Sequence, residues 1–287
     1  MKIFKVIRLT FGEFRRDRAG AQAAALAYYA MFALAPMLLI AIGIGGLWLG
    51  EKHARDEIMG HLEGIIGEKS EQAVGSTVSQ LSEKVNSVAS IVVGLAVLFL
   101  AASGVFTQIH DSMNQMWGIE AKVHPIKGAW LFVRKRLLSF VLVLLSGLVM
   151  LASLASGAAV NLADQWLSLW LTMPPDALVL LEFVASLVLV GLFVTLILKY
   201  LADVAIAWRY ALLGALLTSL LLNVGEVVFG IYLKRSLIVS AYGAAGSLIV
   251  LLIWLYYSGL IFYIGVEFTQ VIAHLDGRPI RPSKWLK

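Results

Sequence analysis

The chain has 287 residues, of which 60% are hydrophobic and only 14% are charged. Soluble globular domains carry about 25% charged residues, so the composition excludes that class and indicates a protein that crosses a membrane several times. The formal net charge is +5. The chain has no Cys, and this absence excludes disulfides and thiolate metal sites. Basic residues of membrane proteins gather beside the cytoplasmic ends of the spans, so the positive balance does not indicate a nucleic-acid partner.

Residues 1–18 are predicted to form a basic amphipathic helix on the cytoplasmic side. Six of them are Lys or Arg, and Ile3, Ile7, Phe11 and Phe14 recur at about the spacing of one helix face. Helices of this kind lie on anionic membrane surfaces. The helix either recruits lipid headgroups or only anchors the topology of the chain, and the pattern favours the second interpretation.

Uncharged or nearly uncharged stretches predict six transmembrane helices in an all-α fold. A helix needs about 20 residues to cross the hydrocarbon core, and every stretch is long enough. Pro36 is expected to kink the first span because it removes a backbone hydrogen bond. Gly243 and Gly246, near the start of the sixth, allow a neighbouring helix to approach closely. The spans lie at about residues 19–50, 85–110, 137–163, 177–198, 210–233 and 238–266, within a transmembrane domain of residues 19–273.

Loop charges predict the orientation of the chain. Six spans place both termini on one side, and a cytoplasmic N-terminus leaves 17 of the 23 Lys and Arg residues inside. Both termini are therefore predicted to be cytoplasmic, including a basic tail at residues 274–287. The polar segment at residues 51–84 is then periplasmic, and its apolar spacing predicts two amphipathic helices that cap the bundle. Three spans in each half would make any relation between the halves an inverted repeat, a plan that many transporters share.

Ionisable side chains inside a span are the first candidates for function. Each costs at least about 2.5 to 3.5 kcal/mol at the helix centre. Glu226 lies in the fifth span with Asn223 on the same helix face, and Glu182 lies in the fourth. Two interpretations stay open. The carboxylates line a cavity and bind a cationic group or protons, or they pair with Lys234 or Arg235 and hold the helices in register.

Further polar residues complete the candidate sites. Tyr28 and Tyr29 either line the same cavity or are packing residues with a bonded hydroxyl. Four residues at the inner ends of the spans would form a gate or a headgroup entry site, although ordinary interfacial charges explain them equally simply. These inner residues are Arg209, Glu267, Asp111 and Asn114.

Four stretches of the chain resemble the YihY/BrkB family of bacterial inner-membrane proteins, over almost the whole length. They are ALAYYAMFALAP (25–36), SGVFTQIHDSMNQMW (103–117), WRYALLGALL (208–217) and, most specifically, YGAAGSLIVLLIWLYYSGLIFYIGVEF (242–268). One departure is Ala202, where the family often has Pro before the Asp. The resemblance implies a six-helix inner-membrane protein with envelope functions. Some members of the family are associated with export or flipping of lipid A precursors, and another with serum resistance, a virulence trait.

The leading functional hypothesis is a transporter or flippase of an amphipathic envelope lipid, of the lipid A precursor or phospholipid type. Export of a small polar solute and a non-transporting scaffold for envelope proteins are the alternatives. There is no GxxxxGK[ST] motif, so movement would not be nucleotide-driven. No catalytic set, cofactor motif or metal-ligand spacing is visible, which argues against an enzyme and against the tRNA-processing ribonuclease label once given to the family. The expected partners are membrane lipids and envelope proteins, with no nucleic acid.

Overall fold

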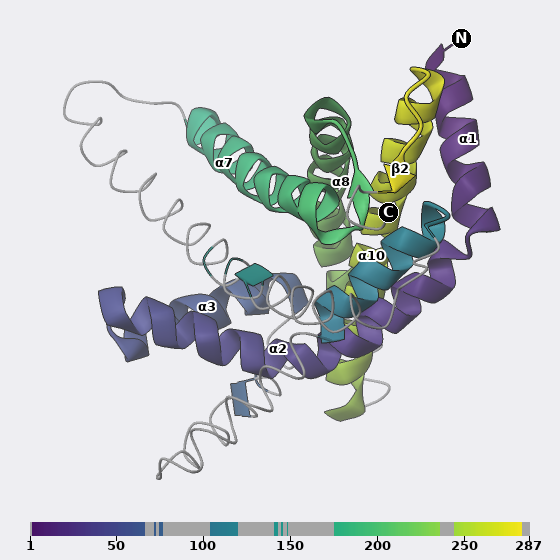
Figure 1. Ribbon diagram of the computed structural model, residues 1–287. Helices are drawn as coiled ribbons and strands as arrows, with labels where there is room; N and C mark the ends of the chain where they lie inside the picture. The colour runs from purple at the N-terminus through teal and green to yellow at the C-terminus, as the bar shows by residue number, and fades with distance from the viewer. Residues whose placement is uncertain are drawn as a thin grey trace.

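The computed structural model describes residues 2–66, 72, 75–76, 104–119, 141–142, 145, 148, 175–235 and 244–282. These parts of the chain are mostly helical (Figure 1). The helices are α1 (Lys2–Arg16), α2 (Ala19–Leu49), α3 (Glu51–Ile66), α7 (Pro175–Leu196), the π-helix η1 (Ile197–Leu201), α8 (Trp208–Arg235) and α10 (Ala244–Leu275). Residues 104–116 are also helical. Two strands of two residues each, β1 (Val204–Ala205) and β2 (Arg281–Pro282), pair antiparallel.

Three of the described helices are long and apolar enough to cross a membrane. They are Phe183–Leu201, Trp208–Leu233 and Leu248–Leu275, and a shorter apolar stretch, Ala19–Leu34, lies in α2. These helices coincide with the predicted fourth, fifth, sixth and first spans. Most of the predicted spans at 85–110 and 137–163 lies outside the described residues. The mostly helical membrane fold is thus confirmed, while six spans, cytoplasmic termini and inverted halves stay predictions.

The structure differs from the predicted elements in two details. The fold is not purely helical, because the short β1–β2 pairing joins the chain before α8 to the chain after α10. The sixth span was predicted at about residues 238–266, and the helix α10 continues beyond it to Leu275. Its final turns are covered, since Val271 is buried and α1 packs against this helix. A charge in the sequence therefore does not mark the end of this helix.

Helix α10 is the centre of the described fold. It packs against α2, α8 and α1, and Figure 1 shows α1 running beside its C-terminal half. The larger apolar core surrounds Tyr263 and Val266 of α10 and includes Met113, Leu198 and Ala211. A second core lies where α2 and α3 meet the N-terminal half of α10. This arrangement brings the termini of the described chain to the same end of α10.

Two glycines set the contact between α8 and α10. A Cβ atom on Gly214 would lie 1.8 Å from Thr269 Oγ1, and one on Gly265 would lie 1.8 Å from Thr218 Oγ1. Each threonine hydroxyl donates to a carbonyl oxygen in its own helix, Thr218 to Gly214 at 2.8 Å and Thr269 to Gly265 at 2.7 Å. Both helices thus present a G-x-x-x-T face to each other. Small residues of this kind let membrane helices approach without a gap.

Candidate functional site

Polar side chains are buried on the helix of residues 104–116, within the stretch SGVFTQIHDSMNQMW. His110, Ser112 and Asn114 are all less than 10% exposed. The helix is held against α10 by Trp117, whose Nε1 donates to the carbonyl oxygen of Val266 at 3.4 Å. Buried polar groups in a membrane bundle are costly unless they are paired, and these are paired with residues from two other parts of the chain. We call the residues Gln22, Gln108, His110, Ser112, Asn114 and Asp203 the inner polar cluster.

One half of the inner polar cluster joins the 104–116 helix to α2. Gln22 Oε1 accepts hydrogen bonds from Gln108 Nε2 at 3.0 Å and from Ser112 Oγ at 2.9 Å. Gln22 Nε2 donates to Gln115 Oε1 at 2.8 Å. Both the oxygen and the nitrogen of the Gln22 side-chain amide therefore form hydrogen bonds. Gln22 is the only strongly polar side chain in the stretch from Ala19 to Tyr28, and it fixes α2 to this helix.

The other half joins the same helix to the loop before α8. His110 Nε2 lies 3.0 Å from Asp203 Oδ2, and His110 Nδ1 lies 2.8 Å from Asp111 Oδ1. Asn114 donates to Asp203 Oδ2 at 3.2 Å, and the backbone N–H of Asp203 donates to Asn114 Oδ1 at 3.0 Å. The amide nitrogen of Asn114 also lies 3.1 Å from His110 Nε2, so the histidine ring is enclosed by two carboxyl groups and an amide. Asp203 is the residue on which these contacts converge.

Local structure holds Asp203 in place. The chain leaves α7 through the π-helix η1, a rare conformation that is often found at functional sites. Lys199, in η1, donates to the carbonyl oxygen of Ile206 and lies 5.5 Å from the ring centre of Trp208. This lysine closes the loop of residues 202–207 and adds a cation–π contact. Ala202, where the family often has Pro, is buried within this loop.

A third polar group lies where α1 packs against α10. Glu267 is fully buried and interacts electrostatically with Glu13, Arg16 and Asp17 of α1. Arg16 pairs with Glu13, and its Nε donates to Asp17 Oδ1 at 3.2 Å. The hydrogen bond to Asp17 raises the pKa of the Arg16 guanidinium, so Arg16 stays charged. The turn into α2 follows at Arg18, whose φ of 51° lies in the left-handed region that non-glycine residues rarely adopt.

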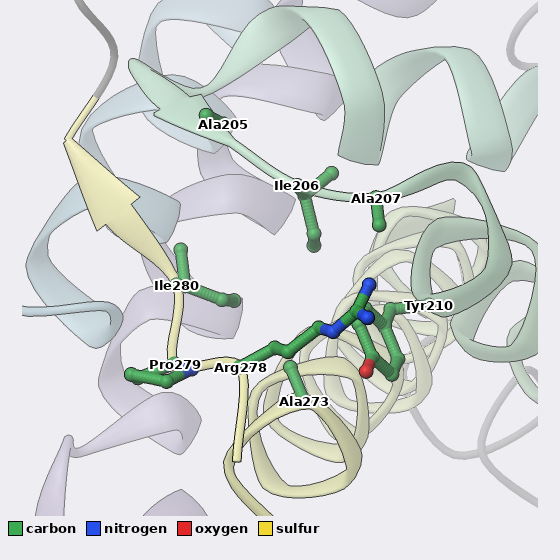
Figure 2. Close-up of a pocket in the computed structure, with 8 residues that line it drawn as sticks. All are labelled: Ala205, Ile206, Ala207, Tyr210, Ala273, Arg278, Pro279 and Ile280. Carbon is green, nitrogen blue, oxygen red and sulfur yellow. The ribbon is translucent and has the colours of Figure 1, made fainter. Parts of the chain in front are cut away.

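A small cavity lies beside the β1–β2 pairing. Figure 2 shows Arg278 extending toward Tyr210 across this cavity, with Ile206 and Ile280 on its other side. Its volume is about 150 Å³. Binding pockets for small molecules usually measure about 300 to 1,000 Å³, so this cavity is too small for an amphipathic lipid. Tyr210 is held by Arg209 and by a hydrogen bond of 3.2 Å to Asp276.

The four predicted inner residues lie in three separate groups. Asp111 and Asn114 belong to the His110–Asp203 contacts, whereas Glu267 faces α1. Arg209 contacts Tyr210 and forms an exposed ion pair of 3.5 Å with Asp276. Their roles as gate residues stay predictions.

The predicted pathway residues are partly described. Asn223 donates to the carbonyl oxygen of Ser219 in its own helix at 2.8 Å, and Glu226 is half-buried one turn further on. Among the described side chains, none forms an ion pair with Glu226, but the side chains of Lys234 and Arg235 are outside that set, as is that of Glu182. Whether these carboxylates serve transport or ion pairing therefore stays open.

The aromatic and packing residues of the first and sixth spans are placed as follows. Tyr28 is 58% exposed and Tyr29 is 42% exposed, and Tyr28 makes edge-on contacts with Tyr29 and Phe32. Gly246 is buried, and Gly243 lies outside the described residues. The chain stays helical through Pro36. The predicted kink at Pro36 and the cavity role of the tyrosines stay predictions.

Sequence reasoning missed several members of these groups. Gln22 was hidden in an apolar run, and Glu13 and Asp17 looked like surface charges of a basic helix. Their spacing carried a signal, since Thr10, Glu13 and Asp17 lie three and four residues apart on one face. Phe14 also belongs to the face toward the core, not to the exposed apolar face on which it was predicted. Acidic residues confined to one side of a basic helix are therefore a sign of a packed face.

The long apolar helices, joined by buried side-chain hydrogen bonds, define an integral membrane protein. The sequence matches the family described as virulence factor BrkB over residues 10–285, and the chain belongs to this family. The resemblance seen in the sequence is thereby confirmed. No solved structure is significantly similar to the chain.

Relatives are named only as membrane proteins. The chain is 28% identical over 265 residues to a UPF0761 membrane protein of Alkalilimnicola ehrlichii, covering 91% of this chain and 56% of the relative. It is 28% identical over 273 residues to a protein of the same name from Tolumonas auensis, covering 93% and 85% of the two chains. A third, from Verminephrobacter eiseniae, is 24% identical over 264 residues, covering 91% and 60%. The chain thus spans less than two thirds of two of these three relatives.

Proposed function

We propose that the protein is a multi-pass transporter or flippase of the bacterial inner membrane, acting on an amphipathic envelope lipid of the lipid A precursor or phospholipid type. The observation that carries the proposal is the inner polar cluster. It places buried hydrogen-bonding side chains from α2, the 104–116 helix and the loop before α8 together among apolar helices. Polar groups buried in this way are costly, and polar groups inside a membrane bundle often mark substrate or ion pathways.

The surroundings of the cluster suit a substrate with a polar head and apolar chains. Gln22 joins the cluster, and further along α2 the aromatic side chains of Tyr28, Tyr29 and Phe32 are 42% exposed or more. Gly104 begins the described part of the polar helix against Tyr29, where a Cβ atom would lie 3.1 Å from the ring. One helix pair thus presents hydrogen-bonding groups at one place and exposed aromatic rings at another. A headgroup and its acyl chains need these two environments at the same time.

The charges support the proposed orientation and energetics. The end of α10 that carries α1 is placed in the cytoplasm, because the segments there are basic and the positive-inside rule applies. The protein would use no nucleotide and no cofactor, and it would not be an enzyme. Its partners would be membrane lipids and envelope proteins rather than nucleic acid. Export of a small polar solute remains the first alternative, and a scaffold that recruits envelope proteins through residues 51–84 is the second.

The test is movement of labelled lipid between leaflets in vesicles that contain the purified protein. We expect fluorescent phospholipid or lipid A-type lipid to become accessible to an external quencher faster than in empty vesicles. Entrapped small polar solutes should leave no faster than from empty vesicles. Solute efflux without lipid exchange would favour the first alternative. Neither activity, with and without a proton gradient, would contradict transport and favour the scaffold.

The exposed face of α1 gives a separate prediction about lipid contact. Ile3 and Phe4 are 77% and 75% exposed, and Ile7 is 51% exposed, beside the basic Lys5 and Arg8. A peptide of residues 1–18 should therefore bind anionic vesicles. Replacing Phe4 and Ile7 by Ser should weaken binding at least about tenfold, because each buried apolar side chain contributes roughly 1.5 to 3 kcal/mol.

Vesicle co-sedimentation measures this binding, and a Thr10→Ser peptide is the matched control because Thr10 is buried in the protein. High salt should also weaken the binding of the wild-type peptide to the vesicles, because salt screens the attraction between its Lys and Arg residues and the anionic lipids. Equal binding of the double-Ser peptide and the control would exclude the exposed apolar face as a lipid contact.

A further inference from the structure

The contact between α1 and α10 holds more acidic groups than donors. Glu13 and Asp17 on α1 and Glu267 on α10 are three carboxyl groups, and Arg16 is the cation that interacts with them. The Arg16 side chain is 64% exposed, whereas Glu267 is 0% exposed. The positive charge therefore lies at the rim of the contact, and the buried carboxyl group lies away from solvent.

Glu267 has no hydrogen-bond donor within the described residues. Both of its carboxyl oxygens are buried and unpartnered, and so is Asp17 Oδ2, while Asp17 Oδ1 accepts from Arg16. Asp17 and Glu267 interact electrostatically across the contact between α1 and α10. The hydroxyl groups of Thr10 and of Tyr263, which lies one turn before Glu267, are also buried without a partner, and so is Gln270 Oε1. Two buried acceptor groups therefore lie at one helix contact, and the described residues donate no hydrogen bond to the Glu267 carboxyl group.

Two carboxylates cannot share such a position when both are ionised. Like charges close together favour protonation of one partner, and a protonated carboxyl group becomes a hydrogen-bond donor. One proton held between the pair would supply the missing donor and remove one of the excess negative charges. In aspartic proteases a carboxyl pair shares a proton for the same physical reason.

The other charged groups packed against α10 are already paired or distant. The apolar helix α2 has no charge, and His110 of the 104–116 helix contacts both Asp111 and Asp203. Arg209, at the start of α8, pairs with Asp276. Helix α3 meets the opposite half of α10, through Ile58 and Met59. No second base therefore reaches Glu267 from the described elements.

We propose that Asp17 and Glu267 form a proton-binding site that fastens α1 to the C-terminal half of α10. The ligand is one proton, held by one carboxyl group and accepted by the other. Within the described residues, no three His, Cys, Asp or Glu side chains are arranged to hold a metal ion, so the site fits a proton better than a metal. Loss of the proton leaves two buried carboxylates in repulsion and loosens α1. This inference does not depend on the transport proposal, because it concerns proton binding alone.

Infrared spectroscopy of the full-length protein in lipid nanodiscs tests the site directly. Wild type should show the carbonyl band of a protonated carboxyl group at neutral pH, and alkaline titration should remove it. Glu267→Gln and Asp17→Asn should each abolish the band, because an amide supplies the donor and the remaining carboxylate stays ionised. The matched control is Asp276→Asn, an exposed acid, which should keep the band. Absence of the band in wild type at neutral and acidic pH, or its survival in both amide variants, would overturn the proposal.

Thermal unfolding gives an independent measurement. The folded chain holds a proton that the unfolded chain releases at neutral pH, so the stability that this proton contributes is present at low pH and is lost as the pH rises. The melting temperature of wild type should fall by about 3 °C per pH unit across that titration, and Glu267→Gln should remove this fall. If Glu267→Gln does not fold, Asp17→Asn serves as the second variant. A melting temperature that rises with sodium concentration at constant pH, and does not depend on pH, would show that the site binds sodium rather than a proton. That result would overturn the proposal.

Discussion

Replacing Gly214 by Leu is expected to abolish the native contact between α8 and α10. Even a Cβ atom at Gly214 would lie 1.8 Å from Thr269 Oγ1 and 3.2 Å from the carbonyl oxygen of Gly265. The second of these atoms belongs to the backbone and cannot rotate away, so the helices must separate. Overpacking by one small group costs about 1 to 3 kcal/mol, and a Leu side chain at a backbone–backbone contact should exceed that range. We expect little folded protein after purification in detergent.

A smaller substitution at Gly214 and its control both lie in α8. Gly214→Ala should lower the melting temperature by several degrees, since the Thr269 hydroxyl must leave its position. Gly230, four turns further along α8, has nothing within 4 Å of the position of a Cβ atom. Gly230→Ala should therefore be neutral or slightly stabilising, because Ala favours a helix by about 1 kcal/mol over Gly. Equal melting temperatures for the two Ala variants would contradict the close α8–α10 contact.

Replacing Asp203 by Ala should have the second largest effect. Its carboxylate accepts from Asn114 and lies 3.0 Å from His110 Nε2, and both of these side chains are buried. The substitution leaves these two polar groups without this partner, and each buried polar group that loses its hydrogen bond costs about 1 to 3 kcal/mol. For a chain of this size we expect a fall in melting temperature of roughly 10 °C. Thermal unfolding in detergent, followed by circular dichroism, measures it.

The control for Asp203 is another acid that bonds a basic side chain. Asp276 pairs with Arg209 at 3.5 Å, but the two side chains are 55% and 51% exposed. An exposed ion pair contributes about 1 kcal/mol or less, so Asp276→Asn, which keeps an acceptor for the Tyr210 hydroxyl, should lower the melting temperature by no more than about 3 °C. Similar falls in melting temperature for the two variants would show that the inner polar cluster contributes no more stability than a surface ion pair.

Hydropathy was sufficient to predict the apolar helices that the structure describes. The uncharged runs that predicted the first, fourth, fifth and sixth spans match α2, α7, α8 and α10, because a long apolar helix is the form in which a single chain satisfies its backbone in lipid. The end of the last helix could not be predicted in the same way. Glu267 interrupts the apolar run, but α1 covers it, and contacts between residues more than 200 positions apart leave no periodic signal.

The candidate site was predictable only in part. Asp111 and Asn114 stood out as polar residues at the end of a span; Asn114 belongs to the inner polar cluster, and Asp111 contacts its member His110. Gln22 and Asp203 complete that cluster from other segments, and the sequence does not show which segments meet. The G-x-x-x-T faces of α8 and α10 were not predicted either, since the sequence of each helix does not show which other helix it meets.

The proposal that the protein moves lipid is tested most directly by the initial rate of lipid exchange in vesicles with wild type and Glu226→Gln. Glu226 is half-buried within an apolar span, and the substitution keeps its size while removing its charge. We expect exchange above that of empty vesicles for wild type, slowed at least about tenfold by the substitution, which corresponds to a barrier that is higher by roughly 1.4 kcal/mol. Gly230→Ala, about one turn away in the same helix, should keep the rate because a Cβ atom there meets nothing within 4 Å. Wild-type exchange no faster than that of empty vesicles would contradict the account.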